Sequence, residues 1–319
     1  MSPRRRSRTR RCALLLAVSL GMSLFIGCSS RDSAGDAPRK SAVNAAVPNG
    51  TREFADCSDS VVCPRIVSLP GATFLMGSPV TEAGRYDDEG QHTASVQPFA
   101  IGKFLVTRGQ WSAFVKATSH KTDKPECAYA MRLNPTWEDP GFPQTDDHPV
   151  VCITWGEAHG YVEWLSALTG HKYRLLTDDE WEYAARASST TAFPWGDAAS
   201  HEHANYGKDS CCGPDTLGRD RWLFTSPVGS FEPNGFGLYD MHGNVSVWLE
   251  TCADSAEKLP HPNGAPGCVY RYARGGLWGD RPQLMRSAAK NFAPPPGEKM
   301  TIANYRSTGF GLRVARDLP

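Results

Sequence analysis

Cysteine is the residue type with the most chemistry to offer in this chain of 319 residues, which has ten of them. Cys12 and Cys28 lie on either side of an N-terminal apolar stretch, and eight cysteines follow it: Cys57, Cys63, Cys127, Cys152, Cys211, Cys212, Cys252 and Cys268. An even number of cysteines in an exported chain is typical of disulfides. Proximity in the sequence favours three pairs: Cys57–Cys63, Cys127–Cys152 and Cys252–Cys268.

The adjacent cysteines 211 and 212 are left open, because a disulfide between neighbouring residues is strained. A metal site is the alternative for the thiols, but the paired CxxC spacing of zinc sites does not occur in the sequence. The G-x-S-x-G elbow, the P-loop and the H-E-x-x-H helix are also missing. His201-Glu202-His203 places two imidazoles in a polar loop, a pattern more typical of solvated side chains than of a metal site.

The N-terminus predicts an exported protein. Residues 1–27 hold six arginines and no acidic residue, followed by the apolar run Ala13–Ile26. This run is too short and has the wrong flanks for a membrane-spanning helix, so residues 1–27 are interpreted as a signal peptide. Its end, Leu24-Phe25-Ile26-Gly27-Cys28, resembles a bacterial lipobox. We therefore expect lipidation of Cys28 and an anchor in the bacterial cell envelope, on the periplasmic side or the cell surface; ordinary cleavage is the alternative.

Composition divides the remaining chain into two parts. Residues 28–56 are rich in Ser, Ala, Gly, Asp, Pro and Lys, which predicts a flexible tether. Residues 57–319 form a single predicted domain. Lys plus Arg equal Asp plus Glu in the whole chain, so without residues 1–27 the acidic side chains exceed the basic ones by six. That balance excludes the basic footprint of a nucleic-acid-binding protein.

Three helix starts can be recognised by a threonine followed three residues later by Gln or Glu: Thr107/Gln110, Thr154/Glu157 and Thr177/Glu180. This capping box satisfies backbone N–H groups at a helix N-terminus. Strands are expected within Ile66–Ser78 and Ala94–Ile101. The rest of the domain is rich in Gly, Pro and Asn, so we predict an α+β fold with few helices, short strands and extensive ordered loops.

The stretch Ser226–Glu250, SPVGSFEPNGFGLYDMHGNVSVWLE, combines turn-forming Asn-Gly, Gly-x-Gly and Gly-Asn steps with many apolar residues. It resembles PVGSFPPNxFGLYDMxGNVWEW, the signature of the formylglycine-generating enzyme (FGE) or sulfatase-modifying-factor family. Residues 148–165, 173–187 and 193–197 resemble further family motifs in the same order. The resemblance extends from about Ser68 to Arg316 and implies a C-type-lectin-like fold enlarged by long, ordered loops.

In oxidising members of this family, two cysteines five residues apart bind copper(I), for which thiolates are suitable ligands. These oxidising members convert a cysteine of a sulfatase to formylglycine. Aligned on Arg286 and on the two alanines after Ser287, the corresponding places here hold Pro282 and Ser287. Because neither supplies a soft ligand, copper-dependent formylglycine generation is not expected of this chain.

The resemblance also implies structural calcium, which prefers oxygen ligands from loops. Carried over by position, the ligands are the side chains of Asn205 and Asp220 and the carbonyls of Tyr206 and Trp222. Turn capping by the Asn and Asp side chains is the alternative. A second site is weaker, since Asn244 is kept but the family's glutamate is Val247.

A residual groove is expected at Trp278, Arg286, Ser287 and Asn291, which occupy the family's active-site stretch. The alternative is a structural salt bridge for Arg286 and a core position for Trp278. We expect a binding or accessory protein for an unknown peptide, glycan or protein ligand. A periplasmic enzyme that uses other residues, as in metabolite or siderophore maturation, is the alternative, followed by a formylglycine-generating oxidase.

Overall fold

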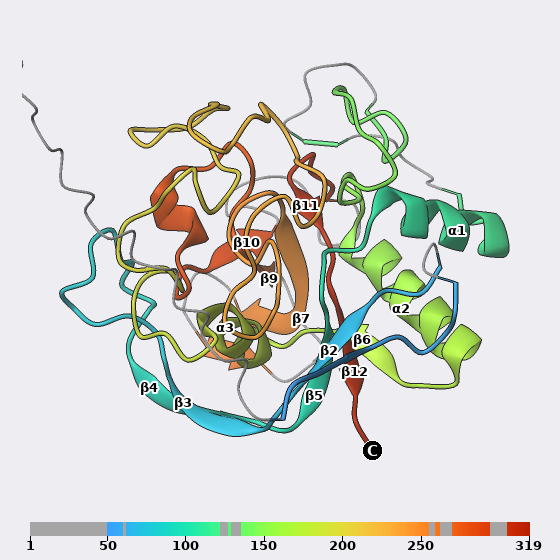
Figure 1. The fold of residues 1–319 in the computed structure, drawn as a ribbon, viewed down its shortest axis with the longest axis horizontal. Coiled ribbons are helices and arrows are strands. Elements are labelled where there is room, and N and C mark those ends of the chain that lie inside the picture. The colour runs from blue at the N-terminus through green and yellow to red at the C-terminus, as the bar shows by residue number, and fades with distance from the viewer. Residues whose placement is uncertain are drawn as a thin grey trace, which may run out of the picture. The chain divides into compact units, whose positions relative to one another are not determined.

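The structure is a computed structural model that describes residues 50–59, 62–121, 127–128, 135–254, 259–261, 270–293 and 305–319. All of them belong to one compact unit, residues 45–319. Figure 1 shows few helices, short strands and long connecting loops, which confirms the predicted α+β class. Within the described ranges, no helix is long and apolar enough to cross a membrane. The predicted signal peptide and the lipidation site Cys28 lie outside these ranges.

The three predicted helices all form, each directly after its threonine cap: α1 Arg108–Thr118, α2 Trp155–Thr169 and α3 Asp178–Arg186. In every case the threonine hydroxyl accepts from the backbone N–H of the third residue, whose side chain accepts in return from the threonine N–H. Each such cap stabilises a helix by about 1 kcal/mol. Gly170 ends α2 with a φ of 71°, in the left-handed region that glycine tolerates.

The first sheet is antiparallel and runs in the order β1-β2-β5-β12-β6. Its strands are β1 Arg52–Phe54, β2 Ile66–Leu69, β5 Phe99–Gly102, β12 Val314–Asp317 and β6 Tyr173–Leu175. The sheet is buried on both faces, because Phe99 and Ile101 pack into one hydrophobic cluster and Ala100 into another. The second cluster also holds the apolar side chains of α1 and α2, which lie beside this sheet in Figure 1.

The tether predicted for residues 28–56 is wrong at its C-terminal end. Strand β1 pairs with β2 in register from Arg52–Ser68 to Phe54–Ile66. The Asp56 carboxylate lies 2.7 Å from Arg316 Nε and accepts a hydrogen bond from Tyr173 at 2.6 Å. Composition does not predict these long-range contacts. Because of them, the folded domain begins several residues before residue 57.

The second sheet runs in the order β10-β9-β7-β11, with β8 also paired to β7. Its strands are β7 Ser246–Asp254, β8 Leu259–His261, β9 Tyr270–Arg274, β10 Asn291–Ala293 and β11 Phe310–Gly311. A separate hairpin joins β3 Ala72–Met76 to β4 His92–Val96. Only short strands were expected in the C-terminal part, whereas β7 has nine residues.

Residues 226–245 form an ordered loop within the core, as the sequence predicts, whereas residues 246–250 begin strand β7. The Asn234 side-chain oxygen accepts from the N–H groups of Phe236 and Leu238, while its amide donates to the Ala184 carbonyl in the last turn of α3. Gly243 has a φ of 77°, and a Cβ there would lie 2.2 Å from the Asn205 carbonyl oxygen. Glycine is therefore required at this close approach of two loops.

Two of the three predicted disulfides are confirmed, Cys57–Cys63 and Cys127–Cys152. Cys252 is also disulfide-bonded, but its predicted partner Cys268 lies outside the described residues. In the chain-entropy account, closing the 25-residue separation of Cys127–Cys152 stabilises the fold by about 3 kcal/mol. Cys211 and Cys212 are free and exposed.

Candidate functional site

The two places that hold copper-binding cysteines in oxidising relatives are occupied by a helical turn and a buried serine. Pro282 begins the 3₁₀ turn η1 Pro282–Met285. Ser287 is fully buried, and its backbone N–H donates to the Ala192 carbonyl at 2.8 Å. Its hydroxyl oxygen has no hydrogen-bond partner. A proline and a buried hydroxyl provide no thiolate for copper(I).

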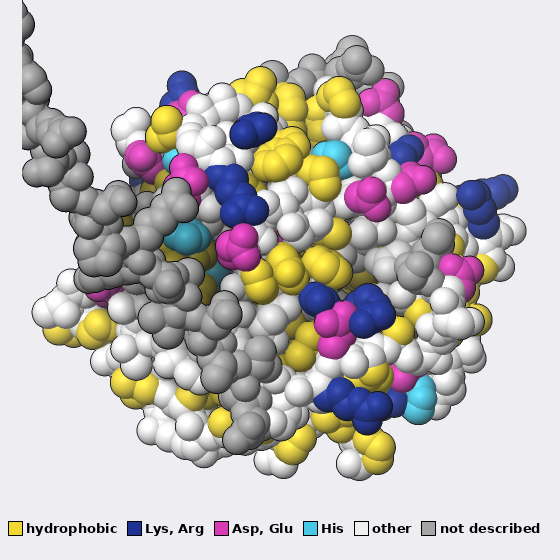
Figure 2. All heavy atoms as spheres, viewed as in Figure 1, with side chains coloured by type: hydrophobic (Ala, Val, Ile, Leu, Met, Phe, Trp, Pro, Cys, Tyr) yellow, Lys and Arg dark blue, Asp and Glu magenta, His cyan; other side chains and the backbone are white. Residues whose placement is uncertain are grey.

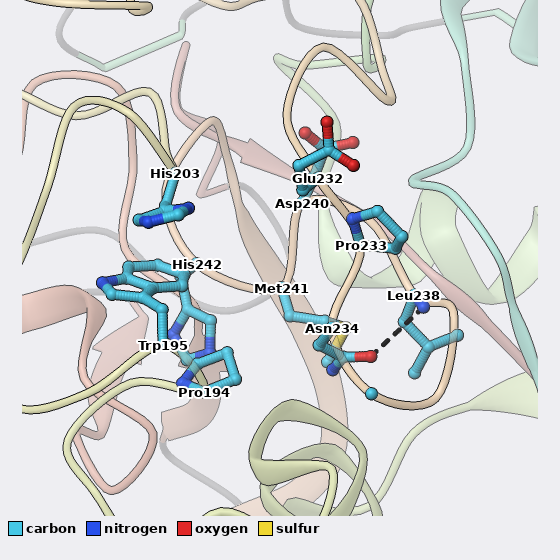
Figure 3. Close-up of a pocket in the computed structure, with 11 residues that line it drawn as sticks. Pro194, Trp195, His203, Glu232, Pro233, Asn234, Leu238, Asp240, Met241 and His242 are labelled. Carbon is cyan, nitrogen blue, oxygen red and sulfur yellow. Dashed lines mark hydrogen bonds between the residues drawn. The ribbon is translucent and has the colours of Figure 1, made fainter. Parts of the chain in front are cut away.

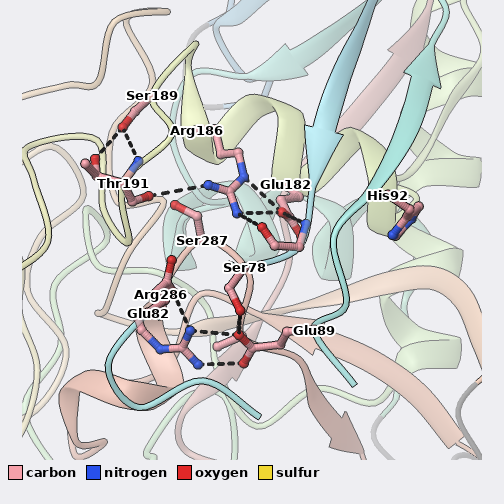
Figure 4. Close-up of polar contacts among 12 residues, drawn as sticks. Ser78, Glu82, Glu89, His92, Glu182, Arg186, Ser189, Thr191, Arg286 and Ser287 are labelled. Atoms are coloured by element: carbon pink, nitrogen blue, oxygen red, sulfur yellow. Dashed lines mark hydrogen bonds and ion pairs between the residues drawn. The ribbon is translucent and has the colours of Figure 1, made fainter. Parts of the chain in front are cut away.

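The guanidinium of Arg286 forms ion pairs with carboxylates inside the protein. Its guanidinium donates to both carboxylate oxygens of Glu89, at 2.7 and 2.5 Å, and to Glu82 at 2.5 Å (Figure 4). The Ser78 hydroxyl adds a third donor to Glu89 at 2.7 Å. Burial raises the pKa of Glu89, but the hydrogen bonds from Arg286 and Ser78 outweigh it and hold that pKa below its ordinary value. This cluster fixes residues 78–89 over Arg286.

A second buried cluster surrounds Arg274, whose side chain is fully buried. Its Nε donates to Asp178 at 2.6 Å, and its Nη2 donates to Glu182 at 3.2 Å. Its Nη1 donates to the backbone carbonyls of residues 287 and 289 at 3.1 and 3.0 Å. Arg186 also pairs with Glu182, and Figure 4 shows Ser287 between Arg186 and Arg286. The family's active-site stretch is thus held by buried ion pairs from both sides.

The other two groove candidates, Trp278 and Asn291, contact residues other than Arg286. Trp278 is 6% exposed, and its indole N–H donates to the Thr308 carbonyl at 3.1 Å. Its ring packs edge-on against Phe224. Asn291 is half-buried and begins β10. No hydrogen bond, ion pair or ring contact joins Trp278 to Arg286 within the described ranges, so a shared groove at these residues stays a prediction.

The four residues predicted to bind calcium converge in the structure. The Asp220 carboxylate is buried and accepts from the backbone N–H groups of Tyr206 at 3.1 Å and Trp222 at 3.2 Å. Asn205, fully buried, donates its amide N–H to the Phe224 carbonyl at 2.8 Å. The Asn205 side-chain oxygen is buried without a hydrogen-bond partner. One orphaned amide oxygen and one buried carboxylate therefore come from adjoining loops.

The electrostatics of this cluster fit a hard cation. Burial raises the pKa of Asp220, and the hydrogen bonds from Trp222, His201 and Tyr206 only partly offset that effect. A bound cation would compensate the carboxylate and satisfy the orphaned oxygen. The described residues contain no group of three His, Cys, Asp or Glu side chains placed to hold a metal. A calcium ion here would rely on Asp220, the Asn205 amide and backbone carbonyls.

The second predicted calcium site has little support from its surroundings. The Asn244 side-chain oxygen accepts from the Ser226 N–H at 3.0 Å, and its amide donates back to the Ser226 carbonyl at 3.1 Å. Val247, in place of the family's glutamate, is buried in the hydrophobic core. Asn244 thus closes a turn in the structure, and its role as a metal ligand stays a prediction.

A pocket of about 220 Å³ opens beside residues 232–242 (Figure 3). Its lining comprises Pro194, Trp195, His203, Glu232, Pro233, Asn234, Gly235, Leu238, Asp240, Met241 and His242. His242 Nδ1 donates to the Met285 carbonyl at 2.7 Å, and its Nε2 is buried without a hydrogen-bond partner. Burial lowers the pKa of His242 to about 4, so this imidazole is neutral at pH 7.

The lining of the pocket includes aromatic and acidic groups. Trp195 is half-buried and stacks on Phe193 and on the exposed ring of His203, each with centroids 5.1 Å apart. Glu232 is exposed and pairs with Arg219 at 3.2 Å. Asp240 accepts from the Gly229 N–H at 2.8 Å, and burial raises the pKa of this carboxyl. Two carboxylates and no Lys or Arg belong to the lining.

Sequence reasoning missed several of these residues. His201 was expected to be solvated, but it is 4% exposed and its Nδ1 lies 3.3 Å from the Asp220 carboxylate. The ion-pair partners Glu82 and Glu89 lie about two hundred positions before Arg286, so no local pattern links them. The sequence of residues 193–197 indicates only a resemblance to a family motif, whereas the structure places Pro194 and Trp195 in the pocket lining.

The fold and the turn-rich residues 226–250 define a class of protein, an α+β domain built on long, ordered loops. The chain belongs to the FGE-sulfatase family, since it matches the sulfatase-modifying factor enzyme 1-like domain over residues 53–318. It is 33% identical over 232 residues to the formylglycine-generating enzyme of Thermomonospora curvata, which covers 62% of this chain and 73% of that one.

Solved structures give the same result for the fold. PvdO from Pseudomonas aeruginosa is similar with a TM-score of 0.69 and 36% identity, covering 84% of this chain and 98% of PvdO. CarF is similar in fold with a TM-score of 0.54 and 22% identity. A relative from Mus musculus, named inactive C-alpha-formylglycine-generating enzyme 2, is 29% identical over 249 residues, which are 68% of this chain and 75% of that one.

Charged side chains are mixed on the face of the protein shown in Figure 2. Basic and acidic groups alternate there with apolar side chains, and they do not gather into one broad basic patch.

Proposed function

We propose that this chain is an exported, lipid-anchored FGE-family protein that binds a ligand and does not generate formylglycine with copper. The observation that supports this proposal most directly is the replacement of the cysteine pair by Pro282 and Ser287, with Ser287 buried between two ion-paired arginines. The anchor is the lipidated Cys28 in the cell envelope. The relative from Mus musculus that is named inactive supports the existence of family members without that activity.

The ion pairs argue further against a copper centre in this stretch. Glu82 and Glu89 surround Arg286 one residue before Ser287. Carboxylates are hard ligands and both are already paired with the guanidinium, whereas copper(I) prefers thiolates. Making room for a metal would break buried ion pairs, and separating such a pair costs about 3–5 kcal/mol. The residues around Arg286 and Ser287 therefore stabilise the fold.

The pocket beside residues 232–242 is the proposed ligand site. Its apolar lining from Pro194, Pro233 and Leu238 can cover an apolar face, while the Glu232 and Asp240 carboxylates can accept from N–H or O–H groups. The Trp195 ring adds an aromatic surface. This combination favours a ligand with a protonated amine or several hydroxyl groups, as found in peptides and amino sugars.

The purified domain should produce no formylglycine above a no-enzyme control when a CxPxR sulfatase peptide is supplied with copper and oxygen. The thiolates that would bind copper are absent, so no residual rate is expected. Mass spectrometry of the peptide measures the result, with a formylglycine-generating enzyme as the positive control. Conversion of the peptide that rises with the amount of this protein would refute the proposal.

Ligand binding at the pocket should change the fluorescence of Trp195. We expect saturable quenching by a lysine-containing tripeptide or a glucosamine tetramer, with a Kd between about 1 μM and 1 mM. Trp195→Phe should remove the signal, and Glu232→Gln should weaken binding at least about fivefold, since it removes an acceptor and a charge. Glu138→Gln, on an exposed loop, is the matched control. Quenching that is equal in Glu232→Gln and in the parent protein would exclude this pocket as the site.

A periplasmic enzyme is the second candidate function, and His242 is the observation that favours it. His242 belongs to the pocket lining, and burial lowers its pKa to about 4, so its neutral imidazole can act as a base toward a bound substrate. In that case His242→Gln would leave binding in place while abolishing turnover of the ligand.

A further inference from the structure

The free cysteines lie together on the loop 207–214. Cys211 and Cys212 are both exposed, and their sulfur atoms are 2.9 Å apart. The loop is closed by a bridge between Gly207 and Pro214 and by a hydrogen bond from the Lys208 N–H to the Gly213 carbonyl at 3.1 Å. The two thiols are therefore presented to solvent by a loop whose ends are fixed.

This loop is attached to the start of the family's active-site stretch. The Gly213 N–H donates to the Gly279 carbonyl at 3.0 Å, and the Gly207 N–H donates to the Asp280 carbonyl at 2.9 Å. A Cβ at Gly207 would lie 2.4 Å from the Gly213 carbonyl oxygen and 2.7 Å from Gly279, so the contact depends on glycine. Residue 281 follows directly, and next comes Pro282. A thiol pair is thus held beside the segment that carries the thiols in oxidising relatives.

We propose that Cys211 and Cys212 form a thiol–disulfide exchange site, which passes two electrons to and from the disulfides of small thiols or peptides. Neighbouring Cα atoms are fixed at about 3.8 Å by a trans peptide, shorter than the roughly 4.4–6.8 Å that a relaxed disulfide spans. The Cα atoms of Cys57–Cys63 and Cys127–Cys152 are 5.9 and 5.4 Å apart. A strained disulfide is reduced more easily, so this pair can cycle while the others stay oxidised.

The exchange proceeds in two balanced steps. The Cys211 thiolate attacks one sulfur of a disulfide RSSR, which forms a mixed disulfide and releases RS⁻. The Cys212 thiolate then attacks the Cys211 sulfur, which closes the vicinal disulfide and releases a second RS⁻. The two protons of the protein thiols end on two RSH molecules. The protein is oxidised by two electrons and the disulfide is reduced.

The surroundings distinguish the two thiols. A hydrogen bond from Cys212 and the positive charge of Arg281 lower the pKa of the Cys211 thiol, whereas the same sulfur contact raises the pKa of Cys212. Arg281 is exposed and is held by a hydrogen bond to the Tyr86 hydroxyl at 3.2 Å. Because the thiolate is the attacking species, Cys211 is assigned the first step.

The test equilibrates the whole protein in buffers of reduced and oxidised glutathione, followed by acid quenching, alkylation and mass spectrometry. Trypsin cleaves after Lys208 and Arg219 and so isolates both thiols in one peptide, DSCCGPDTLGR. We expect this peptide to change reversibly between dithiol and internal disulfide. The change should occur at a ratio of [GSH]² to [GSSG] at least about tenfold below any that opens Cys127–Cys152. Cys211→Ser and Cys212→Ser should instead hold one glutathione each, and Ser210→Ala should behave as the parent.

Three outcomes would overturn the proposal. The peptide could stay a dithiol or a glutathione adduct at every ratio, which would show that the ring does not close. It could open only together with Cys127–Cys152, which would make it an ordinary structural disulfide. Finally, native mass spectrometry could show a copper or zinc ion that is lost in Cys211→Ser and that blocks exchange, which would make the pair a metal site.

Discussion

Replacing Arg274 with methionine is expected to lower the free energy of unfolding by about 3–5 kcal/mol at pH 7. Arg274 is fully buried and pairs with Asp178 and Glu182, which are themselves buried. Methionine has a similar length and keeps the packing. The loss in the free energy of unfolding therefore measures the cost of leaving the buried carboxylates without this partner. It also leaves two backbone carbonyls, of residues 287 and 289, without their donor. Chemical denaturation followed by tryptophan fluorescence measures the change.

The effect of this substitution should depend on pH in a defined direction. Burial raises the pKa of Asp178, but the charges of Arg274 and Lys290 outweigh it and hold the pKa below its ordinary value. This pair therefore stabilises the parent protein above about pH 4, and the stabilisation is lost as the pH falls through the lowered pKa. In Arg274→Met, only Lys290 remains to oppose the effect of burial, so the pKa of Asp178 should rise, and protonation of the carboxylate should reduce the cost of burying its charge. The difference between the two proteins should be full at pH 7 and smaller at pH 4.

Two further variants make this prediction specific. Arg219→Met breaks an exposed ion pair with Glu232 and should cost no more than about 1 kcal/mol. Adding Asp178→Asn to Arg274→Met should restore part of the lost stability, because it removes one buried charge. A loss in Arg274→Met as small as that in Arg219→Met would show that the buried network contributes little.

Removal of calcium should destabilise the protein by about 4 kcal/mol, relative to a free calcium concentration a thousand times the Kd. The ion is proposed to bind the Asp220 carboxylate, the orphaned oxygen of Asn205 and nearby carbonyls. A chelator such as EGTA should therefore lower the thermal midpoint, and added calcium should restore it. Asp220→Asn should lose this response. Glu202→Gln, an exposed carboxylate close by in the sequence, should keep it.

The calcium-free protein should also respond to pH. A carboxyl whose folded pKa is raised destabilises the fold as the pH rises through that pKa, because the folded state binds the proton more tightly than the unfolded state. Chelated protein should thus gain stability as the pH falls toward the pKa of Asp220, whereas calcium-loaded protein should not. Terbium provides a second measurement, since Trp222 can sensitise its emission and calcium should displace it. An unchanged midpoint with EGTA, together with no terbium emission, would refute the calcium site.

Local sequence determined the helices of this protein. A capping box joins residues three apart, and its hydrogen bonds form within a single turn, so the threonines at 107, 154 and 177 identified all three described helix starts. The turns of residues 226–250 are equally local, because Gly, Asn and Asp tolerate the left-handed backbone that Gly243, Asn244 and Asp240 adopt there. The family, the class of fold and the absence of the copper-binding thiols also follow from the sequence, since each depends on which residues stand at given spacings.

Contacts between distant segments were decided by the tertiary structure alone. The carboxylates that pair with Arg286 come from residues 82 and 89, so no sequence pattern predicts that Arg286 forms a buried ion pair. Strand β1 exists because β2 provides its partner, although its own composition resembles a tether. The attachment of the Cys211–Cys212 loop to residues 279–280 is likewise a long-range backbone contact. The helix starts and turns involve residues only a few positions apart in the chain, so the local sequence can determine them. The contacts between distant segments depend on how loops pack, which the preferences of single residues do not encode.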